Sequence, residues 1–240
     1  MRILYVVIAA LFLFNAAQAE NWTKIDQNKE ENPEIQIVKS AEDYDILKFN
    51  TNAYDVSKVF TQRGKSWIIN SPEASKFAKK GEPDLPKLSE SIIIPDKAGV
   101  ETEVLYNDYI EITDIEIAPS KGTIYRNQDP DQIPYTYGDV YSENDFFPAM
   151  EADLSEPFIL RNYRGVTVNV YPFRYNPVEK TLRIYTDISI KVKYTDGKSV
   201  NAFDRNRNTP VTDDYKDVYR DVFVDTHIHI HKSTYTSTST

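Results

Sequence analysis

The chain has 240 residues, a formal net charge of −9 and no cysteine. The acidic balance disfavours nucleic acid as a partner, because phosphate neutralisation by Lys and Arg supplies much of that affinity, and it also disfavours anionic membrane surfaces. The absence of cysteine excludes a Cys–His protease mechanism, which needs a thiolate. Without disulfides the fold must depend on an apolar core, which this length allows.

Residues 1–19 have the pattern of a secretory signal peptide. A charged start at Met1-Arg2 precedes an apolar stretch at 3–14, and Ala17 and Ala19 supply the small residues of a cleavage site. We expect cleavage after Ala19 and export; an uncleaved anchor is the alternative. No later segment is apolar enough to span a membrane.

Residues 20–44 are polar and predict a flexible leader, with Asn, Lys and Glu clustered at 28–33. The whole chain has 17 Tyr, 11 Phe and 13 Pro, and most of them lie from residue 45 onward, where the prolines punctuate the sequence as turns between strands would. We expect short helical turns only, near 71–80 and 213–221.

The clearest predicted element is a hairpin at 165–194. Residues 165–175 form one expected strand, residues 176–180 the turn, and residues 181–194 the returning strand. The period-2 alternation buries one face of each strand and exposes the other. A weaker alternation covers 101–117 and breaks near 107–108. One face is expected to carry Val166, Val168, Val170, Leu182, Ile184, Ile188, Ile190, Val192 and Tyr194.

These strands predict an all-β fold, an antiparallel β-sandwich with long loops and little helix. The domain is expected to cover 45–224. A low-complexity His/Ser/Thr tail follows at 225–240.

Seven motifs in order resemble the gingipain propeptide, the pro-domain of peptidase family C25 cysteine proteases. The resemblance covers about 67–219. The motifs are GEPDLP (81–86), PSKGTIYRNQDP (119–130), IPYTYG (133–138), YSENDFFP (141–148), LSEPFILR (154–161), YRG (163–165) and YNPVEKTLRIYTDI (175–188).

The resemblance implies a jelly-roll-like sandwich without catalytic activity of its own, here lacking the catalytic domain. It implies an inhibitor and intramolecular chaperone of a C25 protease, which gives zymogen latency. It also implies a Gram-negative secretory route through a Sec signal, with a secreted or periplasmic location. Either a truncated or frame-shifted reading frame or a free-standing inhibitor would explain the missing catalytic domain.

The segment 118–138 holds the candidate inhibitory loop. Prolines restrict this loop and lower the entropy lost on docking. A basic side chain suits a pocket with a buried acid, and the resemblance implies a basic blocking residue here. We favour Arg126 followed by Asn127, which implies an Arg-specific partner. Lys121 followed by Gly122 is second and implies a Lys-specific one; the alternative is that both are solvated loop charges.

An aromatic cluster follows the loop. Interfaces are rich in Tyr and Phe, so these rings could contact the protease. The alternative is that they pack beneath their own loop. The cluster comprises Tyr135, Tyr137, Tyr141, Phe146 and Phe147.

Other chemistry has weak support. His227, His229 and His231 could share a strand face and bind zinc, but a tail without a site is the simpler reading. Acidic residues are so numerous that glycosidase-like pairs are expected by chance. We therefore predict no catalytic residue, metal or cofactor, with a C25 catalytic domain as partner and neither nucleic acid nor membrane after signal cleavage. The competing function is a secreted β-sandwich module that binds carbohydrate or a surface protein.

Overall fold

The computed structural model describes residues 22–197, 199–204 and 213–224. The predicted signal peptide with Ala17 and Ala19, and the three histidines of the tail, lie outside the described residues.

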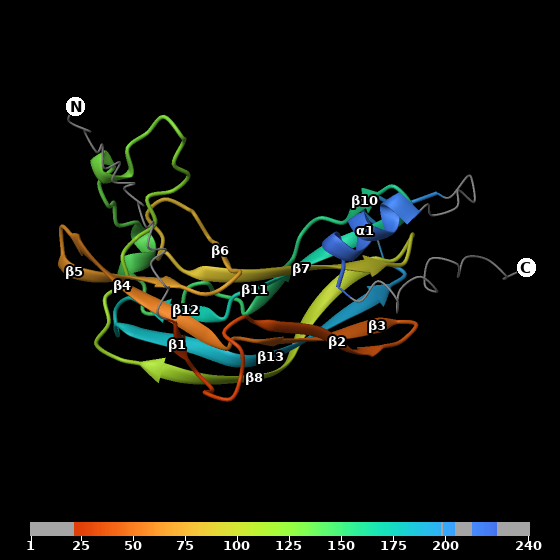
Figure 1. The fold of residues 1–240 in the computed structure, drawn as a ribbon, viewed down its shortest axis with the longest axis horizontal. Helices are drawn as coiled ribbons and strands as arrows, with labels where there is room; N and C mark the ends of the chain where they lie inside the picture. The colour runs from red at the N-terminus through yellow and green to blue at the C-terminus, as the bar shows by residue number, and fades with distance from the viewer. Residues whose placement is uncertain (1–21, 198, 205–212, 225–240) are drawn as a thin grey trace, which may run out of the picture.

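The described chain forms three antiparallel sheets, which confirms the all-β sandwich (Figure 1). The first sheet has the order β1 (Thr23–Lys24), β4 (Ala53–Thr61), β5 (Gly64–Asn70). The second has the order β10 (Phe158–Leu160), β11 (Tyr163–Val170), β7 (Pro86–Ile94), β6 (Ser75–Lys76), with β9 (Ala152–Leu154) also on β11. The third has the order β12 (Phe173–Asn176), β13 (Thr181–Thr195), β3 (Tyr44–Asn50), β2 (Glu34–Ser40), with β8 (Gly99–Ile112) also on β13. Among the described residues, helical structure is limited to the 3-10 turns η1 (Pro130–Gln132) and η2 (Asp139–Ser142) and to α1 (Asp213–Val222).

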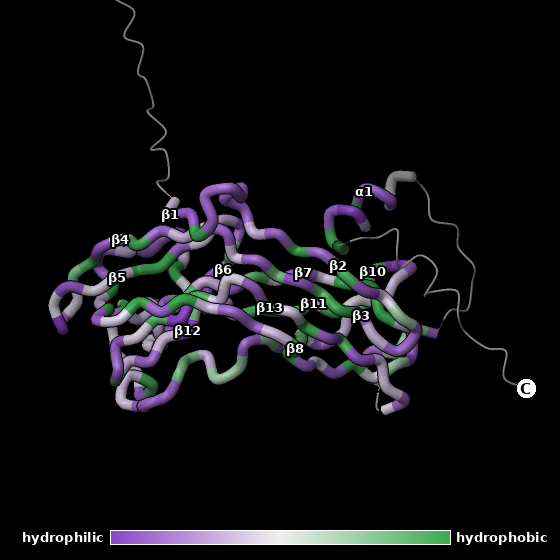
Figure 2. Tube along the Cα trace, turned by 90° about the horizontal axis from the view of Figure 1, so that it is seen from below, coloured by the Kyte–Doolittle hydropathy of each residue, from purple (hydrophilic) through white to green (hydrophobic). Residues whose placement is uncertain are grey.

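The main core lies between the second and third sheets. Polar and apolar residues alternate along the strands in Figure 2, as expected when one face of each strand is buried. The expected valine face of β11 and the isoleucine face of β13 are both at most 1% exposed and belong to one cluster. These residues are Val166, Val168, Val170, Ile188, Ile190 and Val192.

Of the predicted hairpin at 165–194, the turn and the returning strand are confirmed and the first strand is wrong. Residues 165–175 are not one strand, because β11 ends at Val170 and pairs with β7, whereas β12 pairs with β13 in the other sheet. Pro172 separates the two strands and has no N–H to continue a ladder. In the turn, the Asn176 carboxamide oxygen accepts from the N–H of Val178 and of Glu179, both at 3.1 Å.

The expected break near 107–108 has a structural cause. The pairing of β8 with β13 shifts register between Tyr185 and Asp187, opposite Tyr109 and Asp108, and shifts again near Leu105. Such bulges bend and twist a strand, which interrupts its period-2 pattern.

The segment 20–44 differs from the expected flexible leader. It contains β1 and β2 and the first residue of β3, and Ile37 of β2 is buried against the main core. Dense charges conceal the short Ile35–Ile37 alternation in the sequence. The helical expectation is confirmed at 213–221, whereas 71–80 forms turns and the short strand β6.

Helix α1 docks on β10 and β11 through aromatic side chains. Tyr219 is 3% exposed and meets the Tyr163 ring edge-on at 4.7 Å between centroids. Phe223, directly after the helix, stacks on Phe158 at 5.9 Å. Gly165 lies beneath this stack, because a Cβ built there would lie 2.6 Å from Cε1 of Phe223 and 2.9 Å from Cζ of Phe158.

We expect Gly165→Ala to destabilise the domain by about 2 kcal/mol, because the added methyl must displace two packed rings. Denaturant unfolding measures this loss, and hydrogen exchange should show faster exchange for the amides of α1 than for those of β13. A variant as stable as the parent would show that α1 does not depend on this close approach.

The environment of Glu90 on β7 predicts that the stability of the domain depends on pH. Burial raises its pKa, partly offset by the Ser91 N–H that it accepts at 3.0 Å. Because the pKa of this carboxyl is higher in the folded than in the unfolded chain, protonation favours folding. The ionised carboxylate therefore lowers the free energy of unfolding at neutral pH, and this loss disappears once the pH falls below the pKa of the unfolded chain. We expect Glu90→Gln to be more stable than the parent at pH 7, with the difference closing as the pH falls toward 4.5. Urea midpoints of both proteins across this range test it; a difference independent of pH would contradict it.

Candidate functional site

The loop at 119–138 is tied at both ends to one place in the domain. The N–H of Gly81 donates to Ser120 O at 3.0 Å, and the Ser120 N–H donates to Glu82 O at 2.7 Å. At the other end the Gly138 N–H donates to Gly81 O at 2.8 Å. Gly81 has φ +88°, and a Cβ on Gly138 would lie 3.0 Å from the Gly81 carbonyl oxygen, so this closure needs glycine at both positions. The loop therefore leaves and rejoins the body at one point and projects from it (Figure 1).

The β4–β5 hairpin braces the returning half of the loop. The hydroxyls of Thr61 and Tyr137 lie 2.7 Å apart, and the Gln62 carboxamide donates to Tyr135 O at 2.6 Å. The Arg63 guanidinium lies 3.9 Å from the centroid of the Tyr137 ring. These contacts restrict the conformations of the free loop, so the loop loses less conformational entropy when it docks.

Lys121 is used within the loop. Its ammonium donates to Pro130 O at 2.8 Å and lies 4.4 Å from the centroid of the Tyr135 ring. Its neighbour Gly122 has φ +80° and approaches Lys80 so closely that a Cβ would meet the Lys80 Cβ at 3.0 Å. The side chain of Lys121 thus joins the two sides of the loop, and its neighbour packs against the body.

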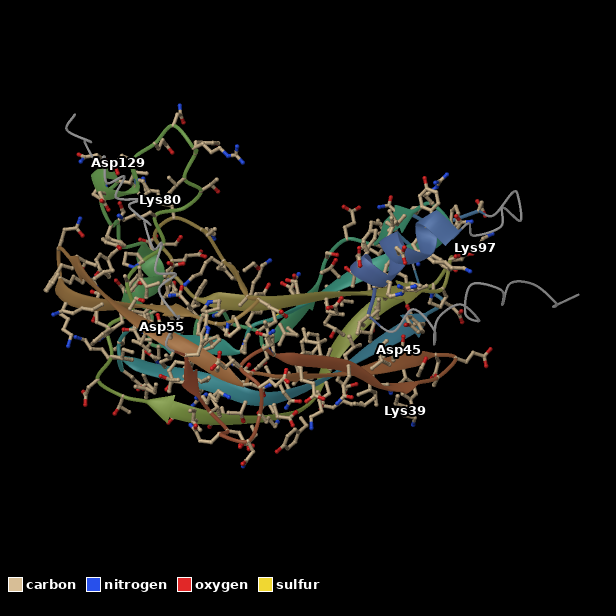
Figure 3. The ribbon with its side chains drawn as sticks, viewed as in Figure 1. Lys39, Asp45, Asp55, Lys80, Lys97 and Asp129 are labelled. Carbon is tan, nitrogen blue, oxygen red and sulfur yellow. The ribbon has the colours of Figure 1, made fainter. Side chains whose placement is uncertain are left out.

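Arg126 and Asn127 are the central residues of an exposed turn. The Gln128 N–H donates to Tyr125 O at 2.9 Å, and the Gln128 side chain accepts from the Tyr125 N–H at 3.0 Å. The Arg126 guanidinium makes no hydrogen bond or ion pair with the residues that the structure describes. Beyond the turn, Asp129 (labelled in Figure 3) caps η1 by accepting from the Asp131 N–H at 2.9 Å. The two hydrogen bonds between Tyr125 and Gln128 close the turn and hold Arg126 at an exposed position.

The aromatic cluster packs largely within its own domain. Tyr141 is 5% exposed and donates to Ile117 O at 2.9 Å, and burial raises its pKa. Tyr137 meets the Tyr141 ring edge-on at 4.7 Å. The other three, Tyr135, Phe146 and Phe147, are half-buried.

Phe146 and Phe147 sit away from the loop. The Arg183 guanidinium lies 3.8 Å from the Phe146 centroid, and the Phe147 ring meets Phe77 edge-on at 5.4 Å. Both rings therefore support the segment after η2, whereas Tyr135 and Tyr137 belong to the returning half of the loop.

No group of three or more His, Cys, Asp or Glu side chains in the described ranges is placed to hold a metal ion. Within those same ranges, no helix is long and apolar enough to cross a membrane.

Sequence reasoning missed two features. One is a face of the β4–β5 hairpin, whose period-2 pattern at 58–60 and 65–67 was a readable signal. The other is Arg164, which is 0% exposed and lies inside a quoted motif, but no sequence signal marks an arginine as buried.

Comparison with known proteins gives the class of protein that has this fold: the pro-domain of a protease zymogen. A family model described as Propeptide_C25 matches residues 26–223, and the chain belongs to that family of gingipain propeptides. The match includes most of the segment that the sequence analysis placed before the domain.

Named relatives agree with this assignment. Gingipain R2 of Porphyromonas gingivalis is 40% identical over 190 residues, which cover 78% of this chain and 26% of the relative. The chain spans between 9% and 26% of the length of the curated relatives it matches. A solved complex of the Porphyromonas gingivalis RgpB pro- and mature domains matches with a TM-score of 0.73 and 38% identity, covering 80% of this chain and 97% of the other.

A structure concerned with the zymogenic latency of gingipain K from the same organism matches with a TM-score of 0.59 and 18% identity, covering 73% and 98% of the two chains. This likeness shows a shared fold.

Proposed function

We propose that this domain binds the catalytic domain of a gingipain-type C25 cysteine protease, keeps it latent and assists its folding, with Arg126 in the specificity pocket. The observation that carries the proposal is the contrast within one loop: Arg126 is exposed at the tip without a partner among the described residues, while Lys121 is held by Pro130 and Tyr135. The solved relative that contains both pro- and mature domains supports such a partner.

The chemistry of arginine supports an Arg-specific partner. A guanidinium can make two parallel hydrogen bonds to a carboxylate at the base of a pocket, which is strong and geometrically selective. The braced turn presents Arg126, followed by Asn127, with little conformational entropy left to lose. The relatives at 40% identity are named as R-type gingipains, whereas Lys-gingipain HG66 is 24% identical.

We also propose that residues 1–19 direct export and that the domain acts in the periplasm or outside the cell. The domain itself supplies no thiol nucleophile, since the chain has no cysteine. Purified chain should therefore show no peptidase turnover of its own.

Titration of purified residues 20–240 against an Arg-specific gingipain-type protease tests the proposal. We expect stoichiometric loss of cleavage of an Arg substrate, and weaker inhibition of a Lys-specific enzyme. A folded chain that leaves the Arg-specific enzyme fully active at micromolar concentration would overturn inhibition in trans.

A further inference from the structure

One face of the β4–β5 hairpin carries two lysines and two aromatic rings, here named the basic–aromatic face: Lys58, Phe60, Lys65 and Trp67. The register places Lys58 opposite Trp67 and Phe60 opposite Lys65, so all four share one face. Along each strand the ammonium lies over the ring two residues on, at 4.7 Å for Lys58 on Phe60 and 4.3 Å for Lys65 on Trp67.

The tip of this face is open to solvent, whereas Trp67 is half-buried and packs against the buried cluster that contains Ile69 and Leu85. Phe60 is 70% exposed, more than any other large apolar side chain of the described residues, and both lysines are exposed. Neither lysine forms an ion pair within the described chain, although the protein as a whole has a net charge of −9. An exposed aromatic ring flanked by uncompensated lysines suits an acidic protein surface, because it combines apolar area with charge complementarity.

The basic–aromatic face is continuous with the candidate inhibitory loop. Phe60 and its neighbours at 59–62 line one open hollow of about 570 Å³ together with Lys121, Asp131, Ile133, Pro134 and Tyr135 of the loop. Tyr125, beside Arg126, is itself 67% exposed. Figure 1 shows the β4–β5 hairpin and the loop at the same end of the molecule, opposite α1. A protein that receives Arg126 in a pocket therefore has its surrounding surface close to this hairpin.

We propose that the basic–aromatic face is a second docking surface for the protease catalytic domain, where Phe60 contacts an apolar patch and Lys58 and Lys65 face acidic groups. This inference rests on the proposed function. The occupant follows from the continuity with the loop and from the charge: a pocket that accepts Arg126 is acidic, and two further cations on the adjoining hairpin have no acidic partner within the described chain.

The test measures inhibition of an Arg-specific gingipain-type protease by the chain 20–240 and its variants. Phe60→Ala should raise the inhibition constant about tenfold, as for an exposed aromatic that becomes buried in an interface. The matched control is Tyr106→Ala on β8, which also removes an exposed ring (54% exposed) and should leave inhibition unchanged.

The charges are tested by the association rate. Lys58→Glu combined with Lys65→Glu should slow association about tenfold at low salt, and the difference should shrink as salt is added. The control is Lys39→Glu combined with Lys191→Glu, which makes the same change in net charge around the Tyr44 ring, where the two ammonium groups lie at 5.0 and 4.1 Å. Lys39 is labelled at the other end of the molecule in Figure 3.

Arg126→Ala in the same assay separates the two proposals. If Arg126→Ala loses potency while Phe60→Ala and the Lys58/Lys65 variant match their controls, the second surface is overturned and the proposed function stands. If the parent chain does not inhibit, the proposed function fails and this inference fails with it.

Discussion

Arg126→Ala is expected to raise the inhibition constant of the domain about a hundredfold, equivalent to about 3 kcal/mol, which is typical of a central interfacial arginine. The side chain has no partner among the described residues to lose, and the turn beneath it is closed through Tyr125 and Gln128, so the change should leave the fold intact. The inhibition constant against an Arg-specific protease measures the effect. Circular dichroism and thermal unfolding of the variant check that its fold is unchanged.

Two further variants make this result specific. Arg126→Lys keeps the charge but loses the paired hydrogen bonds, so it should fall between the parent and alanine. Lys121→Ala removes the bond to Pro130 O and should weaken inhibition only a few-fold by loosening the loop. A larger loss for Lys121→Ala than for Arg126→Ala would assign the blocking role to Lys121 and the partner to the Lys-specific class.

Arg164→Met is expected to destabilise the fold by about 4 kcal/mol. This arginine is fully buried, and its guanidinium donates to the carbonyl oxygens of Pro95 (2.7 Å), Ala98 (2.9 Å), Val200 (2.7 Å) and Asn201 (3.0 Å). It joins the turn after β7 to the segment after β13, and burial lowers its pKa, so the cation depends on these acceptors. Methionine fills part of the volume but leaves the carbonyls without a donor.

Equilibrium unfolding in guanidinium chloride measures this loss. The control is Arg220→Met on α1, whose side chain is 64% exposed and pairs with Asp217 within the same helix; we expect a change below about 0.5 kcal/mol. An Arg164→Met domain within 1 kcal/mol of the parent would mean that water replaces the guanidinium at these carbonyls.

Strand periodicity was readable where one face of a strand stays buried along most of its length. Polar and apolar residues alternate along 181–194 except at Tyr185–Asp187, and β13 buries Leu182, Ile184, Ile188, Ile190 and Val192 of the predicted face. The same periodicity wrongly predicted a single strand at 165–175, because the apolar pattern continues through Tyr171 and Phe173 while the chain crosses from one sheet to the other. The spacing of apolar residues in the sequence indicates which residues are buried, but it does not indicate to which sheet their strand belongs.

By itself, the sequence determined the class of fold, the family resemblance and the loop that holds the candidate residues, because these depend on local pattern and on motifs in order. Tertiary structure alone decided that β2 joins a sheet, that Tyr141 lies in a core and that Arg164 is buried against four carbonyls. It also separated two basic residues five positions apart, since Lys121 meets Pro130 and Tyr135 across the loop while Arg126 lies at its tip. The physical reason is that a side chain's partners come from residues distant in sequence, so its freedom to bind another protein is a property of the folded chain.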